Sequence, residues 1–512
     1  MFAPDQNKEQ KMPSRSVKSL LFAVSSLLVV RAHVVIAADQ PQWGERYSRN
    51  MVSSEKGLPA TFDLKTGDHI LWTASLGGGS YGSPIVANGK VFIGSNNSEP
   101  RDPRHKGDRG VMLCLNEKDG SLCWQLVVPR TGGDDYLDWP GVGLCSAPTV
   151  EGDRVYTVTN RSEVVCLDLD GLADGNDGPY KDEGRHMTPA DQSAMELGPT
   201  DADIVWMFDM RTGVGMYPHD SPHVSILLDG DYLYLNTCNG VDNTHVKVRS
   251  PDAPSLIALD KKTGRLLGKD GEGIGSRIFH CTWAPPSLGE VNGRRLLFFG
   301  GADGVCYAFN ALPPKVPETV RTLERAWRFD CDPSAPKEDI HSYRNNTKEG
   351  PSEIMGMPVF YRNRVYVTAG GDLWWGKYQA WLKCIDATKT GDVTKTAEVW
   401  SYPLERHSCS TPAVVNGLVF VTDCAGNVHC VDADSGQAYW THDVGNKIWG
   451  SPLAADGKVY VGASNGAFAV FAADKAKNVL FTTKFDDEIN GTPTVANGVL
   501  YIPTLSRLYA IK

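Results

Sequence analysis

The chain of 512 residues lacks the positive charge that binding to nucleic acid requires. Its formal net charge is −10, and no part of it combines a basic patch with interleaved aromatic side chains. We therefore expect no nucleic-acid partner. A Cys-x-x-Cys-His motif is also absent, which excludes covalent attachment of a c-type haem to these residues. None of the 12 cysteines is adjacent to another cysteine in the sequence.

Long hydrophobic runs are scarce as well. The apolar run near the N-terminus, residues 19–30, is too short to span a membrane comfortably. Basic residues precede it and small residues at 35–38 follow it, which is the pattern of a cleaved export signal. We expect residues 1–38 to be a signal peptide and residues 39–512 to be the mature domain, with no transmembrane segment after its removal. The sequence thus predicts a periplasmic or extracellular location.

The chain instead contains a sequence motif that it repeats eight times: a small residue, a proline, a polar turn and an alternating apolar strand. The copies begin at Ser83, Ser146, Ser221, Ala284, Gly356, Ser410, Gly450 and Gly491. Each copy predicts a short β-hairpin, because proline is tolerated at a strand's first residue and the turn residues accept positive φ. A third strand follows, and then a fourth that often carries tryptophan. The spacing of 40 and 41 residues between Pro412, Pro452 and Pro493 suits a four-stranded blade. The sequence therefore predicts an all-β, eight-bladed β-propeller of antiparallel blades.

The two ends of the repeat array are complementary. The last copy stops after three strands, at residues 509–512, whereas residues 70–76 read as a fourth strand with nothing before it. We expect these two ends to pair within one blade and close the ring. Closure would remove the exposed strand edges that invite aggregation.

The repeat also carries a specific resemblance. The pattern Asp432-x-x-x-Gly436-x-x-x-Trp440, and a near copy that ends at Trp124, resembles the tryptophan-docking repeat of pyrroloquinoline-quinone-like propellers, the quinoprotein alcohol dehydrogenase-like superfamily. The resemblance covers about residues 43 to 512. It implies an eight-bladed ring, in which Gly268 and Leu480 stand where two docking tryptophans would be. The superfamily contains quinone-dependent dehydrogenases and also cofactor-free members such as the outer-membrane assembly propeller, so the fold leaves the function open.

Four cysteines share one position in the repeat, which alanine occupies in other blades. They are Cys114, Cys166, Cys384 and Cys430. A buried thiol at such a position behaves as a small apolar residue, so we predict that these cysteines pack between blades.

Ionisable and aromatic residues gather just before the repeat prolines, where the innermost strands begin. In a propeller these positions converge on one mouth of the central channel. Three hypotheses follow from them. The first is a solvated channel mouth, or a contact for a protein partner, that binds no small molecule. The second is a channel-mouth metal ion: His219, His280 and His407 come from three blades, and imidazoles with nearby cysteines suit zinc or copper.

The third hypothesis is a quinoprotein, as the resemblance implies. Its chemistry needs calcium, an aromatic floor, cations for the quinone's carboxylates and a carboxylate base. Glu353 and Asn490 are the candidate calcium ligands, and Trp283 or Trp449 is the candidate aromatic floor. Arg406 or Lys447 would pair with the carboxylates of the quinone, and Asp220 would be the base. The known dehydrogenases of this fold also carry two adjacent cysteines over the cofactor, and this chain has no such pair.

Inserted loops supply further candidate surfaces. Trp374, Trp375, Tyr378 and Trp381 follow a Gly-Gly pair, and they form either a binding platform or a hydrophobic cap on the blade. The sequence therefore predicts an exported binding or assembly module. It would act on a protein partner or a small molecule through its channel mouth and inserted loops. The alternative is a dehydrogenase that uses pyrroloquinoline quinone (PQQ) and calcium to oxidise alcohols or sugars.

Overall fold

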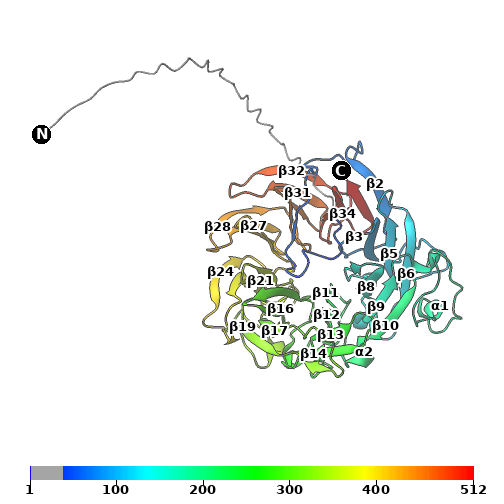
Figure 1. Cartoon of the computed structure of the whole chain (residues 1–512), viewed down its shortest axis with the longest axis horizontal. Helices are drawn as coiled ribbons and strands as arrows, with labels where there is room; N and C mark the ends of the chain where they lie inside the picture. The colour runs from blue at the N-terminus through cyan, green and yellow to red at the C-terminus, as the bar shows by residue number, and fades with distance from the viewer. Residues whose placement is uncertain (2–37) are drawn as a thin grey trace, which may run out of the picture. The chain divides into compact units, whose positions relative to one another are not determined.

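The computed structural model describes residues 38–512 together with Met1, and residues 38–512 by themselves form a ring of eight sheets (Figure 1). Each sheet contains a meander of four antiparallel strands, so the predicted eight-bladed propeller is confirmed. The predicted signal segment falls almost entirely on residues 2–37, outside the described residues. No helix among the described residues is long and apolar enough to cross a membrane.

The first four blades follow one another along the chain, and two of them gain a short outer strand in parallel pairing. Blade one contains β3 (Ile85–Ala87), β4 (Lys90–Asn96), β5 (Arg109–Asn116) and β6 (Leu122–Pro129). Blade two contains β7 (Thr149–Glu151), β8 (Arg154–Val158), β9 (Glu163–Asp168) and β10 (Ile204–Asp209). Blade three contains β11 (Leu227–Asp229), β12 (Tyr232–Asn236), β13 (Leu256–Asp260), β14 (Leu266–Lys269) and the outer strand β18 (Arg321–Thr322). Blade four contains β15 (Ser287–Val291), β16 (Arg294–Gly300), β17 (Val305–Asn310), β19 (Arg325–Asp330) and the outer strand β23 (Gly391–Asp392).

The next three blades have fewer insertions, and one accepts a two-residue strand, β1 (Val52–Ser53), on its inner edge. Blade five contains β20 (Val359–Tyr361), β21 (Arg364–Gly370), β22 (Ala380–Asp386) and β24 (Glu398–Leu404). Blade six contains β25 (Ala413–Val415), β26 (Leu418–Thr422), β27 (Asn427–Asp432) and β28 (Ala438–Asp443). Blade seven contains β29 (Leu453–Ala455), β30 (Lys458–Gly462), β31 (Ala467–Ala472) and β32 (Val479–Lys484), with β1 beside β29. Helical turns are confined to connections: η1 (Asp135–Leu137), η2 (Gly171–Ala173), α1 (Glu183–His186), α2 (Met210–Gly213), η3 (Ile274–Arg277) and η4 (Ile340–Tyr343).

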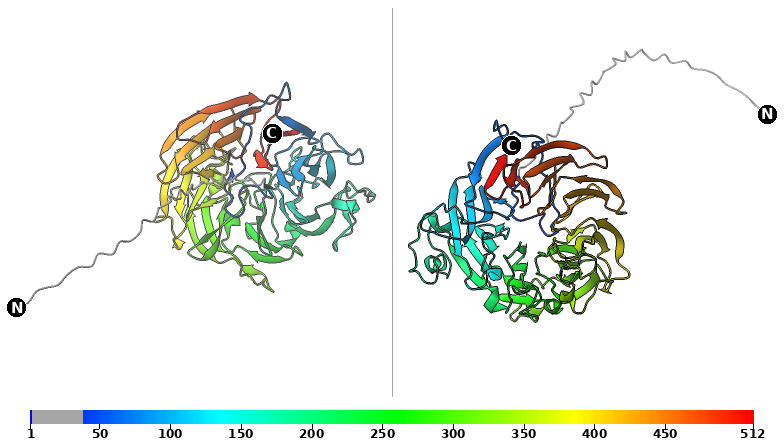
Figure 2. Two further views of the ribbon diagram at one scale, coloured as in Figure 1. Left: turned by 45° about the horizontal axis from the view of Figure 1, so that its top comes forward. Right: turned by 180° about the vertical axis from the view of Figure 1, so that it is seen from behind.

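Blade eight joins the two ends of the ring, as the sequence predicts (Figures 1 and 2). It contains β33 (Thr494–Ala496), β34 (Val499–Pro503), β35 (Arg507–Ile511) and, from the N-terminal side, β2 (Ile70–Ser75). β2 pairs antiparallel with β35, from Ile70 opposite Ile511 to Ser75 opposite Arg507. This pairing leaves no gap in the ring.

Docking tryptophans connect most neighbouring blades. Each of six donates its indole N–H to a backbone carbonyl of the next blade at 2.9–3.2 Å, the donors being Trp72, Trp124, Trp206, Trp327, Trp400 and Trp440. Blade three has Gly268 at this position, as expected. In blade seven the position belongs to Phe481 rather than Leu480, because Val470 pairs with Phe481 as Cys430 pairs with Trp440. The connection between β31 and β32 is one residue longer than that between β27 and β28, because Phe471 pairs with Val479 whereas Val431 pairs with Ala438.

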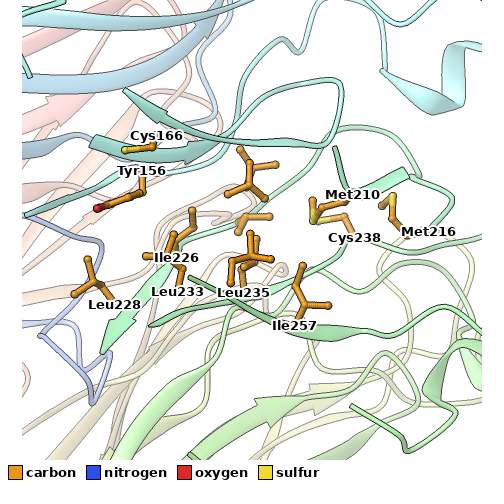
Figure 3. Close-up of a cluster of buried hydrophobic side chains, with 14 of the residues drawn as sticks. Tyr156, Cys166, Met210, Met216, Ile226, Leu228, Leu233, Leu235, Cys238 and Ile257 are labelled. Atoms are coloured by element: carbon orange, nitrogen blue, oxygen red, sulfur yellow. The ribbon is translucent and has the colours of Figure 1, made fainter. Parts of the chain in front are cut away.

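Apolar side chains fill the spaces between blades. Figure 3 shows one such cluster, where Tyr156 and Cys166 of blade two face Ile226, Leu228 and Leu233 of blade three. All four cysteines predicted to pack between blades are free thiols with at most 1% of their surface exposed, so that prediction is confirmed.

A segment before the first blade, residues 38–58, contacts all eight blades; we call it the crossing segment. In Figure 1 it is the dark blue trace that reaches the middle of the ring. Its hydrogen-bond partners, in blade order, are Val86, Val150, Ser225, Leu288, Phe360, Val414, Ala454 and Gly498. Since these partners lie on or beside the innermost strands, the crossing segment occupies the central channel.

Arg49 anchors this segment. Its guanidinium is fully buried and donates to the carbonyl oxygens of Trp43, Ser225 and Pro286 at 3.0–3.3 Å, and to the Ser225 hydroxyl at 3.2 Å. Burial lowers the pKa of Arg49 to about 9, so the side chain remains cationic at neutral pH. The residue thus ties the crossing segment to blades three and four.

Candidate functional site

A cavity of about 530 Å³ lies at one end of the channel, and every blade contributes to its wall. The contributing residues include, in blade order, Tyr81, Cys145, Asp220, Trp283, Met355, Cys409, Trp449 and Asn490. The structure therefore brings positions near the repeat prolines to one place. Trp43 of the crossing segment also lines the cavity.

Aromatic side chains dominate the wall. Two come from the loop that precedes blade two, Tyr136 and Trp139, and two from the loop between β21 and β22, Trp374 and Trp375. The Trp374 ring lies 5.8 Å from Trp283 and 5.6 Å from Trp449, centroid to centroid. Trp374 and Trp375 thus face the cavity, whereas Tyr378 and Trp381 of the same loop group do not line it.

Three histidines form a cluster at one side of this cavity: His219, His245 and His280. One ring nitrogen from each lies within 4.8 Å of those of the other two. The shortest separation, 2.9 Å, joins Nε2 of His219 to Nε2 of His280. His219 and His280 precede the innermost strands of blades three and four, and His245 comes from the loop between β12 and β13.

Buried groups hold two of these rings in place. His219 directs Nδ1 at the carbonyl oxygen of Val241 at 2.7 Å, and His280 directs Nδ1 at Oδ2 of Asp372 at 2.7 Å. Burial, with the nearby His280 and His245 rings, lowers the pKa of His219 well below its ordinary value. The lone pair on His219 Nε2 is therefore available at neutral pH.

Acidic groups lie on both sides of the cluster. Oδ1 of Asp220 is 3.7 Å from Nε2 of His219 and has no hydrogen-bond partner among the described residues. Burial raises the pKa of Asp220 to about 6. Glu353 is fully buried next to Asp372, and burial with that like charge raises its pKa well above the ordinary range. Burial opposes the charge on Asp372 too, but His280 and the Trp375 backbone N–H outweigh it and lower the pKa of Asp372.

The remaining predicted site residues lie elsewhere. Arg406 stacks on Tyr378, 3.8 Å from the ring centroid, and Lys447 is exposed; neither lines the cavity. His407 is buried but does not belong to the histidine cluster; both of its ring nitrogens are unpartnered among the described residues, and burial lowers its pKa to about 4. Glu353 also lies behind the wall rather than on it.

Asp220, Trp283, Trp449 and Asn490 do line the cavity. Asn490 accepts a hydrogen bond from the Ser464 hydroxyl at 2.7 Å. Its amide NH₂ donates to Glu488 at 3.0 Å. The amide group of Asn490 is therefore already engaged with its neighbours.

Three important residues have no counterpart in the predicted site: His245, Asp372 and Tyr136. Each belongs to an inserted loop, where the repeat gives no register to align. A partial signal existed for Asp372, because it lies two residues before the Trp374-Trp375 pair that the composition of the loop singles out. No comparable pattern surrounds His245 or Tyr136.

Comparison with known proteins places the ring in a family. A family model described as outer membrane protein assembly factor BamB matches residues 56–270 and 379–479, which is more than half of the chain. The chain belongs to this family of PQQ-type propellers. Such propellers cover both assembly factors and quinoprotein dehydrogenases among the similar proteins.

Individual relatives of this PQQ-type propeller are distant. Quinohemoprotein alcohol dehydrogenase ADH IIB of Pseudomonas putida is 23% identical over 473 residues, which cover 85% of this chain and 61% of that protein. Outer membrane protein assembly factor BamB of Shewanella oneidensis is 29% identical over 138 residues, 24% of this chain and 35% of that protein. A solved europium-containing methanol dehydrogenase is 12% identical with a TM-score of 0.57, covering 92% of this chain and 98% of that one, and it shows the fold alone. The chain thus spans about three fifths of the length of the first relative.

The quinone that the fold family implies does not fit the wall of this cavity. PQQ carries several carboxylates, which need cationic partners, yet among the described residues that line the cavity none is lysine or arginine. The one carboxylate on the wall is Asp220, which would repel an anionic ligand, and Glu353 is not on the wall. No step of chemistry through a quinone follows from these residues.

Proposed function

We propose that this PQQ-type propeller is a binding module whose ligand occupies the cavity at the channel mouth. The observation that carries the proposal is the cavity itself, about 530 Å³ in volume and walled by all eight blades. Small-molecule sites typically measure about 300–1,000 Å³ and are lined by apolar and aromatic groups with a few polar ones.

The wall indicates the chemistry of the ligand. Aromatic faces favour stacked rings and attract cations. Asp220 adds a carboxyl group, and the described wall offers no lysine or arginine that would pair with an anion. The proposed ligand is therefore a neutral or cationic compound that contains a ring. An anionic cofactor such as PQQ is disfavoured by the same residues.

Tryptophan fluorescence of the full chain would test this proposal, because Trp283, Trp374 and Trp449 all face the ligand. The probes are phenyltrimethylammonium, indole, and PQQ with calcium. We expect saturable quenching by the first two and binding of PQQ at least tenfold weaker. Trp283→Ala should weaken the binding of both probes tenfold or more. Trp381→Phe should not, since this tryptophan of the same blade as Trp374 does not line the cavity.

Two results would overturn the proposal. One is stoichiometric binding of PQQ with calcium, together with dye reduction in the presence of an alcohol or sugar, which would favour the quinoprotein alternative. The other is the absence of saturable binding for every probe at millimolar concentration.

A protein partner at the same mouth is the second candidate. Four aromatic side chains near the mouth are unusually exposed, with 37% of Tyr81, 39% of Trp139, 45% of Trp374 and 48% of Tyr378 accessible. A partner loop could insert a ring or a cation between them. A photo-crosslinking amino acid in place of Tyr378, in the producing cells, should then give one discrete adduct. Absence of any adduct at that position would contradict this candidate.

A further inference from the structure

The hydrogen bonds around His219 and His280 leave two nitrogen lone pairs facing each other between the rings. A backbone carbonyl can only accept, so the contact with Val241 requires a proton on Nδ1 of His219. The carboxylate of Asp372 also accepts backbone N–H groups of Trp374 and Trp375 at its other oxygen, so Nδ1 of His280 is the donor there. In neutral rings both Nε2 atoms then carry lone pairs, and these face each other at 2.9 Å. Only a cation placed between the two nitrogens satisfies both.

We propose that His219, His245 and His280 bind one divalent transition-metal ion at the wall of the cavity. The third nitrogen makes the difference between a shared proton and a metal, because a proton joins two acceptors whereas a metal ion joins three or more. The ring of His245 lies 4.8 Å from that of His219 and 5.3 Å from that of His280, centroid to centroid. Metal bonds of about 2.1 Å would place two tetrahedral nitrogen ligands roughly 3.4 Å apart. The two Nε2 atoms therefore need to separate by only about half an ångström.

Groups behind the rings match those that support metal-binding histidines. Such histidines usually donate their second ring N–H to a carboxylate or a backbone carbonyl, which fixes the ring and raises its basicity. Asp372 does this for His280, and the Val241 carbonyl does it for His219. Tyr136 also stacks on His219, 5.6 Å between centroids and 26° between planes. The cluster is therefore organised before any ion arrives.

The donor set selects the class of metal. Three imidazoles suit zinc or copper, whereas calcium takes oxygen ligands almost exclusively. Oδ1 of Asp220, which has no partner among the described residues and lies 3.7 Å from His219 Nε2, is placed to become a fourth ligand. His245, His280 and Asp220 all line the cavity, so a remaining coordination position would face its interior. A water molecule, or an oxygen or nitrogen atom of a ligand, could occupy that position.

Metal loading of the full-length chain tests the proposal without any knowledge of the organic ligand. The protein would be stripped with a chelator, dialysed and titrated with Zn²⁺ and, separately, Cu²⁺. We expect one ion per chain by elemental analysis, and nitrogen hyperfine structure from imidazole ligands in the electron paramagnetic resonance spectrum of the copper form. Less than a stoichiometric ion, or a copper spectrum without nitrogen ligands, would overturn the proposal and leave a shared proton between the rings. Neither result depends on whether the probes of the cavity bind.

Variants identify the ligands. His245→Gln and His280→Gln should each lower the affinity for Zn²⁺ at least 100-fold, and Asp372→Asn, a positioning change, should lower it about 10- to 100-fold. His407→Gln is the matched control, because this buried histidine lies outside the cluster. If that variant does not fold, His442→Gln on β28 replaces it. Equal loss of metal in the control and in the cluster variants would contradict the assignment, and the wild-type copper spectrum decides the matter even if every cluster variant is unstable.

Discussion

The indole N–H of a docking tryptophan performs one task at six of the eight interfaces between blades: it donates a hydrogen bond to a backbone carbonyl of the neighbouring blade. The other two interfaces lack it and are filled differently. Leu312 and Leu323 lie against Gly268 at the end of blade three. Phe62, from the stretch before β2, packs 5.0 Å from Phe481 at the end of blade seven. Apolar contact thus replaces the hydrogen bond where the repeat has lost its tryptophan.

Trp327 offers the clearest measurement of one such bond. Its side chain is fully buried, and its Nε1 donates to the Ala387 carbonyl at 3.2 Å. Trp327→Phe keeps most of the apolar contact but removes the donor, so we expect the free energy of unfolding to fall by about 1–3 kcal/mol. Urea unfolding followed by circular dichroism would measure it. Trp139→Phe, at an exposed tryptophan, should change the stability by less than about 0.5 kcal/mol. An equal loss in both variants would mean that the indole N–H contributes nothing specific.

Single residues of the site were predictable only where the repeat gave them a position. His219, His280, Asp220 and Trp283 stand near the repeat prolines, and the structure brings them together. His407 shares that position in the sequence, but it is not part of the cluster. The repeated motif predicts where the backbone enters the blade and not where each side chain points. The third histidine of the cluster comes instead from an insertion. Spacing along the chain cannot show that the loop of His245 folds back over the channel mouth.

At the scale of elements, the crossing segment has the largest effect on the site. It runs through the channel, and its Trp43 forms part of the wall of the cavity. It does not repeat, and only two of its residues form a strand, so neither periodicity nor the repeat indicates it. Its structure depends on the blades, since every blade supplies at least one of its hydrogen-bond partners. The segment therefore depends on the ring, and the shape of the cavity depends on the segment.

Arg49 allows this dependence to be tested. Arg49→Met removes four hydrogen bonds, three of them buried, and leaves three carbonyl oxygens without that donor. We expect a loss of stability on the order of 3–5 kcal/mol and a weaker response of the cavity tryptophans to bound probes. Denaturant unfolding and the fluorescence titration would measure the two effects.

The matched control in the same segment is Arg46→Met. The Arg46 side chain is 58% exposed and makes an ion pair at 3.8 Å with Glu151, a contact worth less than about 1 kcal/mol. Similar destabilisation by the two substitutions would show that the crossing segment is not anchored by Arg49.

For the whole molecule, the architecture was largely readable from the sequence because the same physical unit recurs. Eight copies of one hairpin motif predict eight blades. The three strands at the C-terminal end of the repeats and the lone strand at the N-terminal end together make one complete blade. The outer strands β18 and β23 and the crossing segment escaped prediction because each occurs outside the repeat. Export of the chain stays a prediction, since it rests on residues 2–37. The location of the proposed binding site, the channel mouth, could be predicted from the repeat, but the chemistry of its wall depends on inserted loops.

Ring closure is the property of the whole molecule that a deletion can test. β35 pairs with β2 on one side and with β34 on the other, so removal of residues 507–512 would expose the edges of both strands. Unpaired edges recruit other chains, and we expect the shortened protein to aggregate or to elute as oligomers in size-exclusion chromatography with light scattering. Deletion of Lys512 alone leaves the β35 ladder intact, because only its contacts with His69 are lost. That control should elute as the full chain does. A shortened protein with the elution volume and melting temperature of the full chain would show that the ring is held by the interfaces between blades and not by the shared blade.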